Sequence, residues 1–203
     1  VHLQWLYTIT GDGGKNNWRG TPVWLNDGKY DFSPLDGRLE SLLRLAPDAV
    51  VMLYLGVNPY PDFFENHPDA LALDENGKPY ASDNSHWFSY AAESYRTSCA
   101  DMLRALAEYL KKSPYGKAVA GIHVVGGRDG QWFPHPYDGS EGNRKAFAAY
   151  LRKVYNNDTA ALRRAWAEPE ITFDTVSVPK PSEMSDVYFL NPENPEHRRW
   201  IDG

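Results

Sequence analysis

Several absences narrow the classes of function that are open to this chain of 203 residues. Its single cysteine, Cys99, excludes an internal disulfide. No run approaches the roughly 18 apolar residues that a membrane-spanning helix needs. No lysine- or arginine-rich block occurs and the net charge is −6, so we expect neither nucleic acid nor a membrane as a partner.

Motifs for metals, cofactors and activated nucleophiles are also missing. The sequence has no H-E-x-x-H, no P-loop and no G-x-S-x-G. The glycines of residues 11–14 are nearest to a dinucleotide fingerprint, but no helical pattern follows them directly. We therefore expect no metal and no organic cofactor, and we interpret His67-Pro68-Asp69 as a loop staple.

The location and the oligomeric state stay open. One cysteine does not fix the compartment, and the chain begins at Val1 without Met. We expect a soluble protein, either cytoplasmic or secreted or periplasmic after removal of a leader.

Aromatic residues are abundant, with 7 Trp, 13 Tyr and 8 Phe, together 14% of the chain. Many occupy polar or proline-rich contexts typical of loops. Flat rings with a polar edge suit both sugar faces and the packing beneath long loops, and both readings stand for each ring.

Hydrophobic patterning predicts strands at residues 1–9, 49–57 and 117–127 and helices at residues 34–45 and 90–112. Two further helices are predicted within residues 141–169, broken at Asn156-Asn157 and capped again by Asp158, and another helix begins in residues 194–203. Ser33 is the predicted cap of the first helix, with Pro34 in its first turn. Residues 75–77 form a turn signal within the long segment 58–88.

Alternation of strands and helices predicts an α/β fold with a parallel sheet. An open doubly wound sheet and a (β/α)₈ TIM barrel compete, and a complete barrel needs about 250 residues. We expect residues 1–203 to form a single, partial TIM-barrel domain, the N-terminal part of a barrel.

Chemistry in such folds lies where strands end and loops begin. The predicted strand ends carry aromatics, amides and carboxylates, a mixture that suits polyhydroxylated ligands. Each of these residues also has a purely structural interpretation: His123 as a core histidine, Asp129 as a turn residue and Gln131 as an inert surface amide. The candidate substrate-binding residues are Trp5, Tyr7, Asn58, His123, Arg128 and Trp132.

Four collinear stretches, which run in order from about Lys29 to Pro179, carry a resemblance to a known family. They are "DGKYDFSPLDGRLESLL", "NPYPDFFENHPDALALDENGKPY", "SYRTSCADMLRALAEYL" and "FAAYLRKVYNNDTAALRRAWAEPEITFDTVSVP". They resemble, in order, elements of the family-42 type of glycoside hydrolases, which are β-galactosidase-like. The resemblance implies a (β/α)₈ barrel of glycoside-hydrolase type that acts on β-linked sugars.

Such enzymes retain anomeric configuration and use two carboxyl groups. The resemblance implies an acid/base Asn-Glu pair at the end of strand four, which falls on Gly126-Gly127 here. Other relatives carry G-E-W slightly later, and that Glu falls on Gln131. Gln131 is an engineered substitution, or Asp129 has taken the acid role, or the protein binds sugars without cleaving them, because an amide transfers no proton.

The leading hypothesis is a retaining glycosidase with an oligosaccharide or glycoside as its partner and Asp129 and Gln131 at its catalytic position. The alternative is a non-catalytic carbohydrate-binding or scaffold barrel. The resemblance implies a nucleophilic Glu near strand seven, which we expect to lie outside this chain.

Overall fold

The computed structural model describes residues 2–6, 22–82, 85–126, 137–183 and 190–203. The chain divides into two compact units. Unit 1 comprises Val1–Pro68, Ala81–His86 and Glu93–Pro134, and unit 2 comprises Asp69–Tyr80, Trp87–Ala92 and His135–Gly203.

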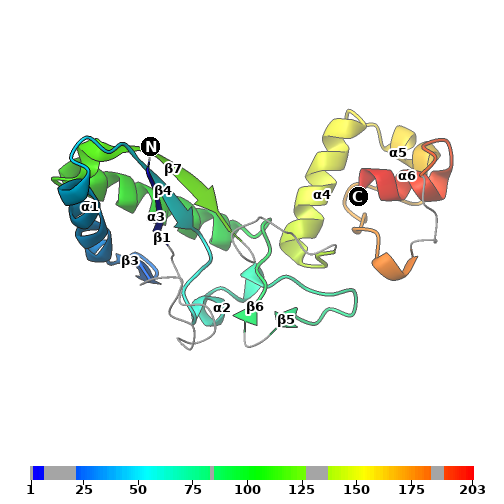
Figure 1. Ribbon diagram of the computed structural model, residues 1–203. Coiled ribbons are helices and arrows are strands. Elements are labelled where there is room, and N and C mark those ends of the chain that lie inside the picture. Colours follow the sequence, from blue (N-terminus) through cyan, green and yellow to red (C-terminus); the bar gives the residue numbers. More distant parts are fainter. Residues whose placement is uncertain (1, 7–21, 83–84, 127–136, 184–189) are drawn as a thin grey trace. The chain divides into compact units, whose positions relative to one another are not determined.

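A three-stranded parallel sheet is the centre of unit 1 (Figure 1). Its order is β1 (His2–Leu6), β4 (Val51–Gly56) and β7 (Val119–Val125), so neighbours in the sheet are also successive in the chain. The three predicted strands are confirmed, each shorter at its ends than the apolar run that predicted it. This order fits both competing architectures, because successive parallel strands are adjacent in a barrel and in half of a doubly wound sheet.

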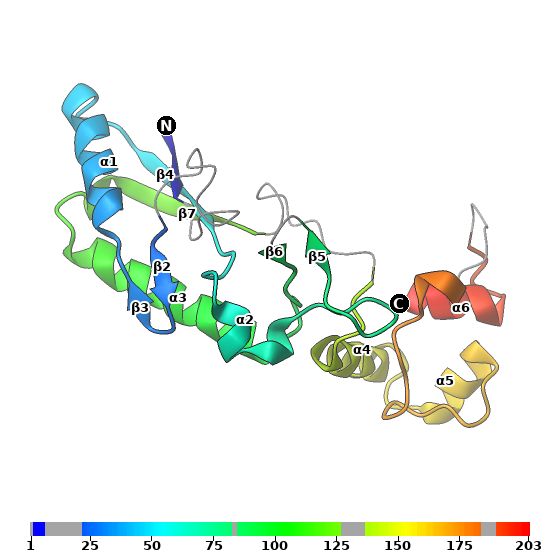
Figure 2. The same cartoon turned by 90° about the horizontal axis from the view of Figure 1, so that it is seen from below.

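Two long helices run beside this sheet, α1 (Ser33–Leu45) and α3 (Glu93–Lys112) (Figures 1 and 2). Leu53 and Leu55 of β4 are fully buried, and so are the core side chains Leu39 and Met102 of the two helices. Because side chains alternate along a strand, Leu53 and Leu55 share one face. This face is therefore the one that the helices cover.

A polar contact joins the two helices. The Tyr109 hydroxyl donates to Asp36 Oδ2 at 2.5 Å, and the Ser113 hydroxyl donates to Asp36 Oδ1 at 2.9 Å. Burial, reinforced by Asp36, raises the pKa of Tyr109 to about 12. The phenol therefore stays protonated and remains a donor to Asp36 at neutral pH.

The prediction that Ser33 caps α1 is wrong. Phe32 is the residue at the cap and makes no side-chain bond there, while Pro34 lies in the first turn as predicted. Asp31 Oδ1 accepts the backbone N–H of Ser33 at 3.0 Å instead. Bonds from Ser33 lower the pKa of Asp31, so the carboxylate that satisfies this helix start is ionised.

Short elements fill the connections of unit 1. Strands β2 (Trp24–Asn26) and β3 (Lys29–Tyr30) form an antiparallel hairpin whose turn contains Gly28 at φ +62°. Figure 2 shows this hairpin beside α3. The other elements are helix α2 (Phe63–Asn66), the β5–β6 pair (Ala81–Ser82 and Ser85–His86) and the 3₁₀ turn η4 (Gly116–Ala118).

Unit 2 begins with a small hairpin. The 3₁₀ turn η3 (Pro68–Ala70) leads to a turn in which Gly77 has φ +76° and its N–H donates to the carbonyl of Asp74 at 3.0 Å. Leu73 then bridges Pro79 in antiparallel fashion. The turn predicted at residues 75–77 is confirmed.

Helices form the rest of unit 2: α4 (Glu141–Val154), α5 (Thr159–Trp166), the 3₁₀ turn η6 (Pro181–Glu183) and α6 (Pro195–Asp202). The break after α4 is confirmed, since Asn156 and Asn157 have φ of 52° and 58°. These left-handed angles suit asparagine better than most residues. The Asp158 carboxylate accepts the N–H of Ala161 at 3.0 Å and caps α5, as predicted.

A buried carboxylate anchors α6 to the other helices of unit 2. Asp202 is only 6% exposed. Its Oδ2 accepts from Trp166 Nε1 at 2.8 Å and from the Tyr155 hydroxyl, and its Oδ1 pairs with Arg198 Nε at 3.0 Å. A buried charge is tolerated only when it is paired and hydrogen-bonded, as here.

We expect Asp202→Ala to lower the free energy of unfolding by about 1–3 kcal/mol, because it leaves the Trp166 N–H buried without an acceptor. The control is Asp174→Ala, which breaks the ion pair with Arg152 Nη2 at 2.6 Å from a side chain that is 87% exposed. Exposed pairs contribute little, so this change should be much smaller. Urea denaturation followed by tryptophan fluorescence measures both, and equal effects would contradict the prediction.

Candidate functional site

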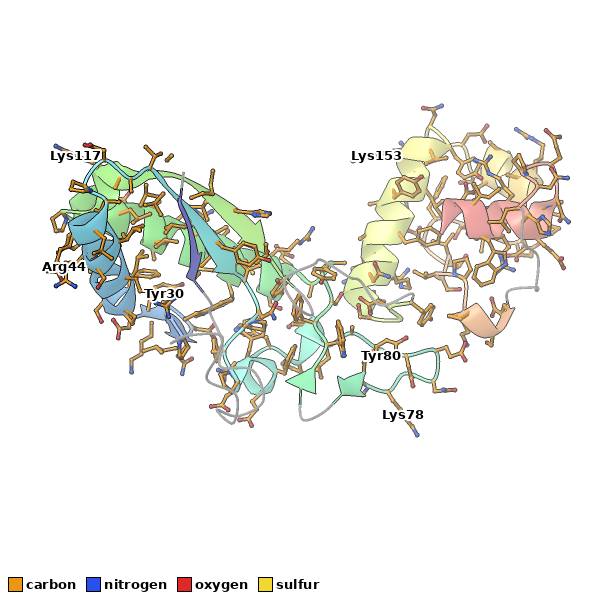
Figure 3. All side chains as sticks on the ribbon, viewed as in Figure 1. Tyr30, Arg44, Lys78, Tyr80, Lys117 and Lys153 are labelled. Atoms are coloured by element: carbon orange, nitrogen blue, oxygen red, sulfur yellow. The ribbon has the colours of Figure 1, made fainter. Side chains whose placement is uncertain are left out.

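The carboxyl ends of β4 and β7 meet at one edge of the sheet. Gly56 pairs with Val125 in register, and the N–H of Val57 donates to the carbonyl of Val125 at 2.8 Å. Lys117, labelled in Figure 3, lies at the opposite end, where β7 begins. Parallel α/β proteins bind ligands at the carboxyl edge, so the candidate site lies there.

A row of three ring-bearing residues crosses the sheet just before this edge. In the register of the backbone, Trp5 lies beside Tyr54, and Tyr54 lies beside His123. The rings of Tyr54 and His123 meet edge to face, 5.2 Å apart at 82°. Tyr54 and His123 lie on the face opposite Leu53 and Leu55, because side chains alternate along a strand and paired residues share a face.

His123 is exposed on that face, whereas Tyr54 is buried. The interpretation of His123 as a core histidine stays a prediction. A ligand contact by His123 stays a prediction.

Asn58 follows the end of β4 in an otherwise buried run. Every residue from 53 to 60 is buried except Asn58. An amide carries both donors and an acceptor, which suits directional bonds to hydroxyl groups. The chain therefore presents one polar side chain at the point where β4 ends.

An aromatic cluster supports the segment after Asn58. The rings of Trp24, Tyr60 and Phe63 pack edge to face, with centroid distances of 5.8 Å, 5.7 Å and 5.3 Å. All three side chains are at most 2% exposed. The cluster joins the hairpin β2–β3 to α2, so two connections that follow different strands are packed together.

Two of the motifs that carry the family resemblance meet beside this cluster. His67 Nε2 lies 2.8 Å from Asp27 Oδ2, although the two residues are 40 positions apart. Asp27 begins "DGKYDF" and His67 begins "HPD". The loop-staple interpretation of His67 agrees with this contact, and Asp27, which sequence reasoning did not single out, is its partner.

Cys99 is held in an inert environment on α3. Its thiol donates weakly to the carbonyl of Val57 at 3.8 Å. Burial raises the pKa of the thiol to about 11, against a hydrogen bond from Tyr95 that lowers it. The reactive thiolate is scarce at neutral pH, so Cys99 is a poor candidate nucleophile.

The catalytic candidates lie outside the described residues. Asp129 and Gln131 do so, as do the candidate substrate-binding residues Tyr7, Arg128 and Trp132. Of the remaining candidates, the structure brings Trp5 and His123 into one row with Tyr54 and puts Asn58 at the same edge of the sheet. The register adds Tyr54, which lies near the end of the second predicted strand but is not among the candidate substrate-binding residues.

Two kinds of feature are absent from the described part of the chain. No group of three or more His, Cys, Asp or Glu side chains is arranged to hold a metal ion among these residues. No described helix combines the length and the apolar character needed to cross a membrane.

Comparison with known proteins identifies the family. The family model described as β-galactosidase, Glyco_hydro_42, matches residues 24–198. The chain belongs to glycoside hydrolase family 42. The resemblance predicted from the four sequence stretches is thereby confirmed.

Relatives of the family 42 chain are β-galactosidases of greater length. Beta-galactosidase Pbg of Clostridium perfringens is 24% identical over 170 residues, which cover 81% of this chain and 23% of that protein. The solved β-galactosidase of the psychrophilic Marinomonas ef1 superposes with a TM-score of 0.59 at 24% identity, over 86% of this chain and 26% of the other. The solved β-galactosidase of Bacillus circulans sp. alkalophilus superposes with a TM-score of 0.62 at 18% identity, over 90% of this chain and 25% of the other.

These likenesses decide the architecture. The family 42 β-galactosidases are TIM barrels, so the three-stranded sheet is part of a (β/α)₈ barrel and not of a doubly wound sheet. The chain spans about a quarter of the length of these relatives. Its described strands are therefore part of a larger family fold.

We expect Cys99 to react slowly with Ellman's reagent at pH 8 in the folded protein, because its pKa of about 11 leaves almost no thiolate. Unfolding in urea should restore the rate of a free cysteine, about 100-fold or more above the folded rate. A fast reaction in the folded state would show that the thiol is neither buried nor protonated. The unfolded sample is the control that the reagent is active and that the Cys99 thiol can react.

Proposed function

We propose that the protein is a retaining glycosidase of the β-galactosidase type that acts on β-linked galactosides. The observation that carries this proposal is the family match over residues 24–198, since the named relatives are β-galactosidases. Support also comes from the ring contact of Tyr54 with His123 and from the partly exposed Asn58 at the carboxyl edge of the sheet. Rings stack on sugar faces, and amides bond to sugar hydroxyls.

The proposed chemistry is a double displacement. An acid protonates the glycosidic oxygen while a carboxylate attacks the anomeric carbon, and the leaving alcohol departs. Water then attacks the anomeric carbon of the covalent intermediate while it gives its proton to the same acid/base group, and the bond between the sugar and the nucleophilic carboxylate breaks. The nucleophile of this proposal belongs to a part of the barrel outside this chain.

Asp129 is the proposed acid/base. Gln131 marks the position at which relatives carry Glu, but an amide has no proton to give to an alkoxide and takes none from water at neutral pH. Asp129 is the nearest carboxyl group in the sequence to that position. Its side chain is shorter than that of Glu by one methylene group, so it must act from a different backbone position.

The remaining residues of the site receive binding roles. Trp5, Tyr7 and Trp132 offer rings for the sugar faces, while Asn58, His123 and Arg128 offer donors to the hydroxyl groups. Tyr54 joins this set because it lies between Trp5 and His123 in the register of the sheet.

We expect Asp129→Asn in the complete gene product to slow hydrolysis of a galactose disaccharide by about 100-fold or more, the usual contribution of a general acid. The rate of the first step should fall less for a 4-nitrophenyl galactoside, because 4-nitrophenolate departs without a proton. Azide should then restore turnover and give galactosyl azide, since azide needs no base to attack the intermediate. A normal rate on the disaccharide would exclude Asp129 as the acid.

The matched control is Asp48→Asn, the same chemical change at an exposed residue before β4. It should leave both substrates unaffected. If the unsubstituted protein binds galactosides but turns over neither substrate, the non-catalytic carbohydrate-binding barrel is correct instead.

We also expect Gln131→Glu to raise the rate on the disaccharide if position 131 retains the geometry of the family. The rate should not rise on a substrate whose leaving group needs no proton, because only a step that protonates the leaving group becomes faster. Comparing kcat/KM on the two substrates measures this difference. An equal gain on both substrates would argue against an acid role at position 131.

A further inference from the structure

Asn58 sits between two fixed points, and the first of them is Val57. The carbonyl of Val57 accepts the Tyr95 hydroxyl at 3.2 Å, and its N–H donates to Val125 at 2.8 Å. Helix α3 and strand β7 therefore both hold the backbone immediately before Asn58.

The second fixed point is Tyr60. Its ring is 2% exposed and packs against Trp24 and Phe63. Its hydroxyl accepts from Asn66 Nδ2 at 3.0 Å. Burial and, after it, the nearby Asp27 carboxylate raise the pKa of Tyr60. Tyr60 is therefore held by its ring and by its hydroxyl, two residues after Asn58.

Asp27 lies near both ends of the segment that contains Tyr60 and α2. Its Oδ2 lies 2.8 Å from His67 Nε2 at the end of the segment, and its charge raises the pKa of Tyr60 at the start. The His67 ring in turn packs against Phe63, 4.4 Å between centroids. One carboxylate on the hairpin thus clasps the connection after β4 at His67 and lies near it at Tyr60.

We propose that Asp27 and His67 are positioning residues of the sugar site, which hold the backbone of residues 57–60 so that Asn58 stays presented at the carboxyl edge. This inference rests on the proposed function, because Asn58 binds sugar only if the site does. Neither Asp27 nor His67 is required to touch the ligand.

The exposure of the pair argues that its role is local. The side chains of His67 and Asp27 are 23% and 43% exposed. Pairs this accessible to water contribute little to global stability. The aromatic cluster beneath them supplies the packing, whereas the contact of Asp27 with His67 fixes the direction in which the segment leaves β4.

Three variants of the complete gene product test the proposal: Asp27→Ala, His67→Leu and Asp27→Asn, the last of which keeps an acceptor. The matched control is Asp62→Ala, an exposed carboxylate at the start of α2 that makes no capping bond. Hydrogen–deuterium exchange of residues 57–62 reports the clasp directly. The KM for 4-nitrophenyl galactoside reports the site.

We expect faster exchange in residues 57–62 and a KM raised about tenfold for Asp27→Ala and His67→Leu, with kcat changed less than about twofold. KM does not depend on the fraction of protein that is folded, so loss of stability alone would lower apparent kcat and leave KM unchanged. Asp27→Asn should recover most of the wild-type KM. Asp62→Ala should match wild type in both measurements.

Unchanged exchange in Asp27→Ala would overturn the clasp. Faster exchange with an unchanged KM would overturn its positioning role. If the wild-type protein binds no galactoside, the proposed function fails and with it the sugar-site role, while the exchange arm still judges the clasp itself.

Discussion

Two-sided parallel pairing of β4 is the constraint on which unit 1 depends. β4 pairs with β1 on one side and β7 on the other, and its register decides which of its residues face the helices. A slip of one residue would turn Tyr54 toward α1 and α3 and expose Leu53. Full burial of Leu53 and Leu55 excludes that slip, so the hydrophobic core fixes the position of Tyr54 and, through pairing, of His123.

Side chains help to support the backbone where β4 ends. Val57 donates its N–H to the carbonyl of Val125 in β7, and Tyr95 reaches the Val57 carbonyl from α3. Further along the described chain, the hydrogen bond and ring contacts of Tyr60 hold the segment. A backbone that must present a polar group at a sheet edge needs such support, because buried loop groups without partners are costly.

Local periodicity predicted the parts of the fold that local sequence determines. The three strands, α1, α3 and the break between α4 and α5 follow from apolar spacing and from Asn and Asp at the break. The cap of α1 was predicted wrongly, because Asp31 and Ser33 can both serve a helix start and only their geometry decides between them. The contact of Asp27 with His67 joins segments 40 positions apart, and no local pattern encodes such a partner.

For the candidate site, the sequence predicted which residues lie at the edge of the sheet better than it predicted the contacts between them. Asn58 and His123 lie at the carboxyl edge because strand ends can be predicted from apolar runs. Tyr54 lies near a predicted strand end but is not among the candidate binding residues, and Asp27 was not singled out. Their relevance emerges only from pairing across the sheet and between loops.

The family motifs and the catalytic group are physically separable. "DGKYDF" and "HPD" meet as a clasp, while the motif over α4 and α5 supplies Phe147, Leu151, Leu162 and Trp166 to the core of unit 2. These motifs therefore preserve a scaffold. Under the proposed function, Gln131 stands where relatives carry Glu, and the two side chains have nearly the same shape but differ in a transferable proton. The proposed mechanism therefore cleaves sugar only if Asp129 supplies that proton.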